Sequence, residues 1–484
     1  MKSRHCHVFL PFLLGFFFAA WMTVFSHANA WASVTLEDEV KVGREFYEKL
    51  EKSHALVEDD TANAYISSLG KRILSHSGHP LFEFKFSIIQ SSAVNAFATP
   101  GGYVYVNQGL ISLVDEESQL AGVMAHEIAH VNCRHIADIV DKSQKLTIPT
   151  LAAILAGAFL GGDAGAAVAS FSVATVTSMS LKYSREHEEE ADRVGMGYLV
   201  ASGYNGQAMM DFLKIMKRYE FYSNSVPSYF LTHPGTDERI RYIDALLHTT
   251  YTKKGADDIV GNLKRIQTTL MLDGKTDPAQ NLKHFEKLLV DDPKDVDALY
   301  GLAVTQDKLG QSRESLDTYQ KALRIAPNDV DILRNCGITL FNMGQYGDAA
   351  AYLGRAMKLN DRHPDAYLYL GKSLESLGNL PDAIRYYKEL VQKKPESPEV
   401  YYNLAMAYGK SRQSGDSHYY FGLYFKKKGK TDSALFHFKE AQKYLSGDTA
   451  RLKEIEKEID SLGRGEAPKA PSAGKGRGRG DKTP

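Results

Sequence analysis

The sequence has few cysteines, few tryptophans and no excess of charge of either sign. Its 484 residues include 3 cysteines and 2 tryptophans, and so few cysteines exclude a disulfide framework. There are 58 lysines and arginines against 59 aspartates and glutamates, so nothing in the charge indicates a nucleic-acid partner. With 24% charged and 43% hydrophobic residues, the composition excludes a mainly disordered chain and a polytopic membrane protein.

The first thirty residues have the pattern of a cleavable secretory signal. Lys2 and Arg4 precede an apolar stretch at 8–24, and Ala28-Asn29-Ala30 offers the small residues of a cleavage site. An uncleaved anchor helix is the alternative, but the apolar stretch is short for a membrane span and polar residues follow it. We therefore expect residues 1–30 to be removed and the mature chain to work in the bacterial periplasm.

The C-terminal half of the chain repeats itself every 34 residues. The repeat is marked by three apolar-glycine pairs, each followed by a small residue five positions on and a bulky one nine positions on: Leu309-Gly310, Met343-Gly344 and Leu377-Gly378. This pattern indicates an all-α solenoid of the tetratricopeptide type over residues 278–446. Gly429 falls 51 residues after Gly378, so we expect the solenoid to be interrupted near 411–420.

Stacked helical hairpins form curved surfaces that bind peptide segments or partner proteins. The alternative is that the array only covers the first domain. Residues 463–484 have no apolar residue larger than alanine and cannot form a core. Around the repeats we expect a first domain at 31–250, a linker at 251–277, a terminal helix at 447–462 and a disordered basic tail at 463–484.

The first domain contains the H-E-x-x-H motif His126-Glu127-Ile128-Ala129-His130, in a run from Glu116 to Val140 that we expect to form one helix. Residues four apart share a helix face, so both histidines can bind one zinc ion. Glu127 is then placed to take a proton from the bound water. A chance copy on an ordinary amphipathic helix is the alternative. On a continuous helix His135 lies about 140° off the ligand face, so we expect it outside the ligand set.

A catalytic zinc site needs a third protein ligand and an open fourth position. The polar run from Ser184 to Asp192 opens a second predicted helix, on which Glu188 and Asp192 share a face. We expect Glu188 to be the third ligand and Asp192 to accept the ring N–H of a ligand histidine. Taken alone, the run is better explained as a solvated acidic helix start, and its pairing with the H-E-x-x-H motif favours the ligand interpretation.

The sequence resembles the CAAX prenyl protease-like zinc metallopeptidases, and within them the bacterial envelope members with C-terminal repeats. Four segments carry the resemblance: Asn95 to Asn107, His126 to His130, Ser184 to Asp192, and Thr232-His233-Pro234 followed by Arg239-Ile240. The resemblance covers about residues 37–250. It implies an α+β zincin-like metallopeptidase domain, mostly helical with a small sheet, followed by the all-α solenoid.

The resemblance also implies a function and partners. It implies a zinc endopeptidase of the bacterial envelope that clears misassembled outer-membrane proteins. Unfolded or misassembled envelope proteins would be the substrates, and the outer-membrane β-barrel assembly machinery would be a partner bound through the repeats. The basic tail and the interrupted last repeat depart from the family pattern and leave the choice of partner open.

A strand pattern precedes the H-E-x-x-H motif. Phe84–Ile88 and Tyr103–Val106 alternate like strands, with Gly101-Gly102 as the turn between them. In zinc peptidases with this helix pair an edge strand lies beside the metal, and a substrate backbone can add to it. A plain hairpin that closes the core is the alternative. The candidates for substrate binding are Ala98, Gly102, Tyr103 and Tyr105.

Two further expectations depend on the family pattern. His233 lies near the metal in that pattern, where it either stabilises the developing oxyanion or fills the fourth zinc position and holds the enzyme shut. Residues 146–181 carry one formal charge, Asp163. We expect them to form a helical lid or a membrane-facing flap, with a buried helical hairpin as the alternative, and peripheral membrane contact stays open.

Two classes of function compete on this sequence. The first is a protease whose repeats bind substrate or partner. The second is a tetratricopeptide scaffold or chaperone with a latent zinc site. The presence of Glu127 beside His126, His130 and Glu188 favours the protease, because a pure scaffold has no need of the general base.

Overall fold

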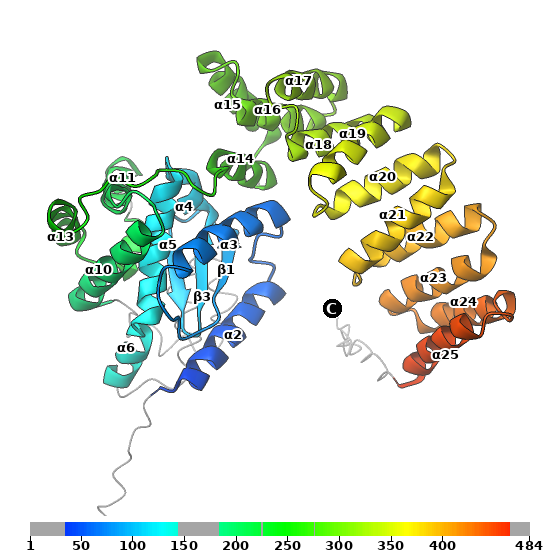
Figure 1. Cartoon of the computed structure of the whole chain (residues 1–484), viewed down its shortest axis with the longest axis horizontal. Coiled ribbons are helices and arrows are strands. Elements are labelled where there is room, and N and C mark those ends of the chain that lie inside the picture. The colour runs from blue at the N-terminus through cyan, green and yellow to red at the C-terminus, as the bar shows by residue number, and fades with distance from the viewer. Residues whose placement is uncertain (1–33, 144–182, 224–225, 275, 465–484) are drawn as a thin grey trace, which may run out of the picture. The chain divides into compact units, whose positions relative to one another are not determined.

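The computed structural model describes residues 34–143, 183–223, 226–274 and 276–464 (Figure 1). The chain divides into two compact units, Met1–Gly274 and Lys275–Pro484. The predicted signal at 1–30, the predicted lid at 146–181 and almost all of the predicted tail lie outside the described residues. Within the described ranges, no helix is both long enough and apolar enough to cross a membrane.

The first unit is mostly helical and contains one small sheet. Helix α5 lies in the middle of this unit (Figure 1) and packs against α3, α10, α11 and strand β2. Its residues Glu117 to Val131 are all buried, so the helix that carries the H-E-x-x-H motif is also the centre of the core. The elements are α2 (Leu36–Lys52), α3 (Asp60–Leu74), β1 (Lys85–Ile89), β2 (Ala96–Thr99), β3 (Tyr103–Asn107), α4 (Gln108–Leu113), α5 (Glu117–Asn132), α6 (His135–Ser143), α10 (Arg185–Ala201), α11 (Gln207–Ser223), α12 (Ser228–Thr232), α13 (Thr236–Thr249) and α14 (Leu263–Asp273).

The prediction of one helix from Glu116 to Val140 is wrong, because α5 ends at Asn132 and a separate helix, α6, begins at His135. Arg134 adopts a left-handed conformation with φ of 56°, which no residue inside an α-helix can do. Its guanidinium donates to the carboxylate of Glu39 at 2.7 Å and to the carbonyl of Val34 at 2.7 Å. These contacts, made to α2 and to the residues just before it, hold a bend that the local sequence does not signal.

The sheet also differs from the predicted hairpin. The strand order is β1-β3-β2, with β1 parallel to β3 and β2 antiparallel to β3. The turn at Gly101 and Gly102, whose φ angles are 82° and 94°, therefore joins β2 to β3 and not β1 to β3. All four residues of β2 are buried, so this strand lacks the alternation by which exposed strands are detected.

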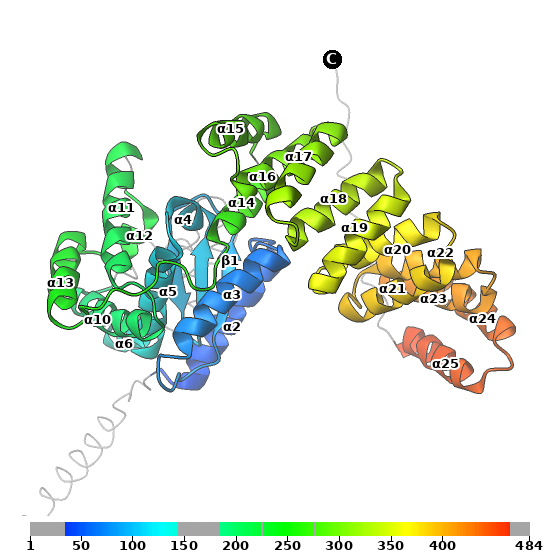
Figure 2. The same cartoon turned by 45° about the horizontal axis from the view of Figure 1, so that its top comes forward.

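The second unit is an array of antiparallel helical hairpins that stack in chain order (Figure 2). Several pairs are packed through a glycine that allows close approach, such as Gly371 against the ring of Tyr387 or Gly337 against Leu353. The helices are α15 (Pro278–Asp291), α16 (Val296–Lys308), α17 (Ser312–Ile325), α18 (Val330–Asn342), α19 (Tyr346–Leu359), α20 (Pro364–Ser376), α21 (Leu380–Lys393), α22 (Pro398–Lys410), α23 (Ser414–Lys427), α24 (Thr431–Tyr444) and α25 (Thr449–Arg464).

The predicted interruption near 411–420 is wrong. Helices α22 and α23 keep the repeat, and Arg412 takes the place of the turn glycine with φ of 63°. Helix α23 belongs to two hairpins: it packs against α22 before it and against α24 after it. Ser417 donates to the carbonyl of Ala405 on α22 at 2.9 Å, while Gly422 packs against Phe438 on α24. This double use shifts the later glycine pattern by half a repeat without a break in the stack.

The predicted fold class is confirmed: a mostly helical α+β domain with a small sheet precedes an all-α repeat domain. The predicted linker at 251–277 is wrong over most of its length. Leu263, Ile266 and Leu270 of α14 lie in the core of the first unit, so that unit continues to residue 274.

Glu117, at the start of α5, fastens this continuation to the core. Its buried carboxylate accepts hydrogen bonds from the backbone N–H groups of Ile259, Val260 and Gly261 at 2.7 to 2.9 Å. The hydroxyls of Tyr204 and Tyr65 add two more, at 2.7 and 3.1 Å. Burial acts to raise the pKa of Glu117, but the hydrogen bonds from Tyr204 and the backbone outweigh it, and the pKa is lowered.

We expect Glu117→Gln to reduce the free energy of unfolding by about 2–4 kcal/mol, because an amide cannot accept five donors. The lowered pKa makes the carboxylate's contribution present above the usual Glu range and lost as pH falls below it. The wild-type chain should therefore lose more stability on acidification than Glu117→Gln. Urea denaturation at neutral and acidic pH measures both effects, and equal stability of the two proteins at neutral pH would contradict them.

Candidate metal site

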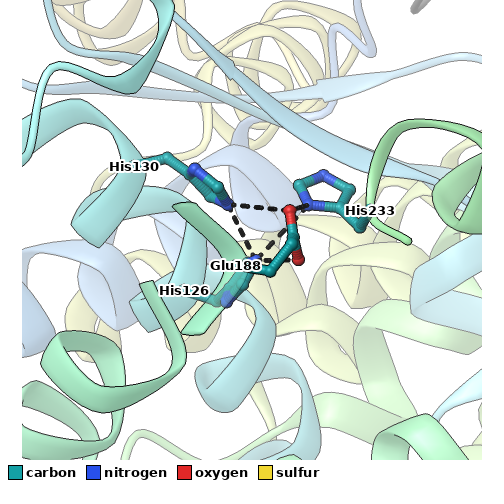
Figure 3. A group of neighbouring side chains, drawn as sticks. All are labelled: His126, His130, Glu188 and His233. Carbon is teal, nitrogen blue, oxygen red and sulfur yellow. Dashed lines mark hydrogen bonds and ion pairs between the residues drawn. The ribbon is translucent and has the colours of Figure 1, made fainter. Parts of the chain in front are cut away.

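Helices α5 and α10 and the junction of α12 with α13 supply the side chains of the candidate site (Figure 3). His126, Glu127 and His130 come from the buried α5. Glu188 comes from the first turn of α10, which Ser184 caps by accepting the N–H of His187 with its hydroxyl. His233 caps the end of α12. Thus α5 and α10 bring the predicted ligands together from positions about sixty residues apart.

Two imidazole nitrogens and one carboxylate converge in this cluster. Nε2 of His126 lies 2.9 Å from Nε2 of His130. The carboxylate of Glu188 lies 3.4 Å from Nε2 of His126 and 3.5 Å from Nε2 of His130. None of the three side chains is more than 1% exposed. Two histidines and one glutamate form a donor set that suits zinc.

Two of the three proposed ligands have the protonation state that metal binding needs. Burial lowers the pKa of His130 well below its usual value, so the ring is neutral. Burial acts to raise the pKa of Glu188, but His233 and Arg239 outweigh it and the pKa lies well below its usual range. Neutral imidazole and ionised carboxylate are the forms that bind metal. Burial and Arg239 act to lower the pKa of His126, but Asp192 and Glu188 outweigh them and raise it to about 9, so this ring must release a proton to bind a metal.

Glu127 faces the cluster without a hydrogen-bond partner for either carboxylate oxygen within the described part of the chain. It is fully buried, and burial raises its pKa. A buried polar group without a partner needs an explanation such as a catalytic role or an unseen water or ion. Glu127 is therefore well suited to exchange a proton with a water molecule.

His233 lies across from the two motif histidines (Figure 3). Its Nδ1 is 3.0 Å from Oε1 of Glu188 and 3.4 Å from Nε2 of His126. Its Nε2 is 3.5 Å from Glu127. One ligand atom from each of four side chains lies within 4.8 Å of the others: His126, His130, Glu188 and His233. His233 thus belongs to the same cluster, and the ring of Tyr229 stacks on it at 4.4 Å.

Asp192 and Arg239 hold the ligands from behind. Asp192 lies 3.0 Å from Nδ1 of His126, so this ring can donate Nδ1–H and present Nε2 to a metal. Arg239 donates to both oxygens of Asp192 at 2.8 and 2.7 Å and pairs with Glu188 at 2.8 Å. Arg239 is in one of the four segments that carry the family resemblance, but the sequence does not predict its contacts with Asp192 and Glu188.

His130 is supported in the same way by His135. Nδ1 of His135 lies 2.8 Å from Nδ1 of His130, and its Nε2 lies 3.2 Å from Glu190. His135 lies outside the ligand set, as we expect, but the reason is different. The bend at Arg134, and not a rotation along one helix, turns its ring back toward His130. Tyr183 stacks on the other side of His130 at 3.9 Å.

Of the predicted substrate-binding residues, only Ala98 lies on a strand edge. Tyr103 and Tyr105 belong to β3, which is paired on both sides, so their backbones cannot pair with a substrate strand, and a contact through their side chains stays a prediction. Tyr105 is also fully buried. Gly102 is structural, since a side chain there would meet the carbonyl of Glu83 at 2.6 Å.

Strand β2 is the edge strand nearer to α5. The N–H of Asn107 donates to the carbonyl of Asn95 at 3.0 Å. The alternation of an antiparallel ladder then directs the N–H and C=O groups of Ala96 and Ala98 away from β3. Ala98 and His130 line one small cavity, so the outward edge of β2 and the candidate metal site are neighbours.

Comparisons with known proteins agree with this arrangement. Residues 60–247 match peptidase family M48, and residues 274–330 and 337–398 match the tetratricopeptide repeat. The chain is 34% identical over 215 residues to the beta-barrel assembly-enhancing protease of Escherichia coli (strain K12), which is 44% of each chain. A putative beta-barrel assembly-enhancing protease of Vibrio cholerae shows the same identity and coverage. The predicted resemblance is confirmed, and the match spans less than half the length of these relatives.

More distant similarities exist for each part. The mitochondrial metalloendopeptidase OMA1 of Schizosaccharomyces pombe is 27% identical over 237 residues, 48% of this chain and 68% of that protein. A crystal structure of MamA covers 36% of this chain and 99% of its own, with 23% identity and a TM-score of 0.30.

We expect Asp192→Asn to weaken zinc binding by about 10- to 100-fold, because it removes the acceptor that orients His126 and the partner of Arg239. Competition with a chromophoric chelator measures the affinity. Glu189→Gln is the matched control, since this residue is on the same helix but exposed. Unchanged affinity in Asp192→Asn would contradict the orienting role.

Proposed function

We propose that this chain, which carries a peptidase family M48 domain followed by tetratricopeptide repeats, is a zinc-dependent endopeptidase of the bacterial cell envelope. Its substrates would be misfolded or misassembled outer-membrane proteins. One observation supports the enzyme class most strongly. The carboxylate of Glu127 is buried without a hydrogen-bond partner in the described structure, beside the convergent His126, His130 and Glu188.

The roles of the side chains follow from their positions. His126, His130 and Glu188 would hold one zinc ion. Such an ion supplies Lewis acidity toward the scissile carbonyl and lowers the pKa of water. Glu127 would take the proton of the attacking water and pass it to the leaving amine. Its raised pKa suits this task, because the same group must accept and then release a proton.

The outward edge of β2 supports a way of binding the substrate. Ala98 is fully buried, so an extended peptide would have to displace what covers this edge before it could hydrogen-bond the outward backbone groups of Ala98, close to His130. Recognition through backbone groups is independent of side chains, which suits a protease for misfolded chains. The repeats would bind substrate or partner, with the outer-membrane assembly machinery as the proposed partner, in keeping with the names of the relatives.

The position of His233 supports a second candidate, a scaffold or chaperone with a self-inhibited zinc site. Its Nδ1 points to the ligand atoms of His126 and Glu188, which is where a fourth ligand would lie. In that position His233 would exclude water and substrate. The two candidates are compatible if a partner displaces His233.

The periplasm is the proposed compartment. This proposal is supported by the signal-like pattern of residues 1–30 and by the relatives, whose names refer to β-barrel assembly. Contact with the membrane surface through residues 146–181 remains a prediction.

We expect Glu127→Gln to reduce cleavage of a misfolded outer-membrane protein by about 10²- to 10⁴-fold, because the general base is lost. The purified chain should retain its zinc, since Glu127 is not a proposed ligand, and metal analysis of the same sample checks this. Glu189→Gln should cleave normally. Equal cleavage by Glu127→Gln and wild type would exclude Glu127 as the base.

A second substitution tests His233. If this ring closes the site in nine molecules of ten, His233→Ala should raise the cleavage rate on the order of tenfold. Initial rates against the same substrate, with zinc content measured in parallel, give the answer. A lower rate with zinc retained would instead assign His233 to stabilisation of the developing oxyanion.

A further inference from the structure

A second group of metal-binding side chains lies on the far side of His130 from the candidate zinc site. Cys133 follows the end of α5, His135 begins α6, and Glu190 is on α10. Their ligand atoms lie within 4.8 Å of one another. His135 is buried, Cys133 is half-buried and Glu190 is exposed, so an ion can reach the group from solvent.

The donor chemistry of this group favours zinc or a softer ion. A thiolate, an imidazole and a carboxylate are all zinc ligands, and the thiolate disfavours calcium and magnesium. The bend at Arg134 creates the group, because it turns His135, at the start of α6, back beside Cys133, which follows α5. Glu190 and Cys133 have freedom to close on an ion, since neither side chain is fully packed.

We propose that Cys133, His135 and Glu190 form a second zinc site, and that an ion bound there weakens zinc binding by His126, His130 and Glu188. The second site would make the protease sensitive to excess metal. The coupling rests on the proposed function only in taking the first cluster to be a zinc site.

The coupling follows from the ring protons of two histidines. When Nε2 of His130 holds a metal, its Nδ1 carries a proton, which it donates to Nδ1 of His135 at 2.8 Å. His135 then carries its own proton on Nε2 and donates it to Glu190 at 3.2 Å. An ion on Nε2 of His135 moves that proton to Nδ1, where it opposes the proton of His130. The buried hydrogen bond between the rings is then lost, and with it the support of the first site.

Cobalt binding to the mature chain under a non-thiol reductant tests the second site. We expect wild type to bind two Co²⁺ ions, one of them with a thiolate-to-cobalt charge-transfer band. Cys133→Ser should bind one ion without the band. Glu188→Gln should keep the band, because the first cluster contains no sulfur. This result is expected even if the first cluster binds no metal. A wild-type chain without the band would overturn the proposal.

Glu190→Gln gives a second variant, since this exposed side chain should tolerate the change if Cys133→Ser does not fold. We expect it to bind the second cobalt ion more weakly than wild type by about tenfold or more, with the band still present at saturation. An unchanged affinity for the second ion would remove Glu190 from the site and overturn the three-residue proposal.

The coupling is measured with two metals. The first site is loaded with one equivalent of radioactive Zn²⁺, and one equivalent of Cd²⁺, which prefers thiolate, is then added. In wild type the affinity for the radioactive zinc, measured against a chelator, should fall on the order of tenfold or more. In Cys133→Ser cadmium should leave it unchanged. The same response in both proteins would overturn the coupling.

Discussion

The structure of the first unit depends on one constraint: a cluster of ionisable side chains is buried, and each charge in it needs a partner. Glu188, Asp192 and Arg239 are at most 5% exposed, and Arg239 pairs with both carboxylates. Removing one partner of a buried ion pair leaves an uncompensated charge, which is more costly than the pair itself. The contacts of Arg239 with two carboxylates therefore fix α10 and α13 around the histidines of α5.

Helix α5 joins this polar cluster to the apolar core. Its residues pack on both sides against α3, α10 and α11, so the motif histidines have few alternative positions. Glu117 anchors the start of the helix through five hydrogen bonds, and the bend at Arg134 sets its end. A site held in this way keeps its ligands in place before an ion arrives, which lowers the cost of binding.

The local parts of this arrangement could be predicted from the sequence, and the non-local parts could not. The four-residue spacing of His126 and His130, and that of Glu188 and Asp192, fixes faces within single helices. The left-handed conformations of Arg134 and Arg412 were missed because glycine is the usual signal for them. The parallel pairing of β1 with β3 was missed because strand order is set by tertiary packing. The contacts of Arg239 and His135 were missed because they join separate helices.

The central claim is that the buried cluster on α5 and α10 is a zinc site with ligands free of sulfur. Zinc K-edge X-ray absorption of the chain loaded with one equivalent of zinc tests this directly. We expect two imidazole nitrogens and carboxylate oxygen at about 2.0–2.2 Å from the zinc, and no sulfur. A sulfur ligand at about 2.3 Å would place the ion at Cys133 instead, and failure to retain zinc at all would contradict the claim.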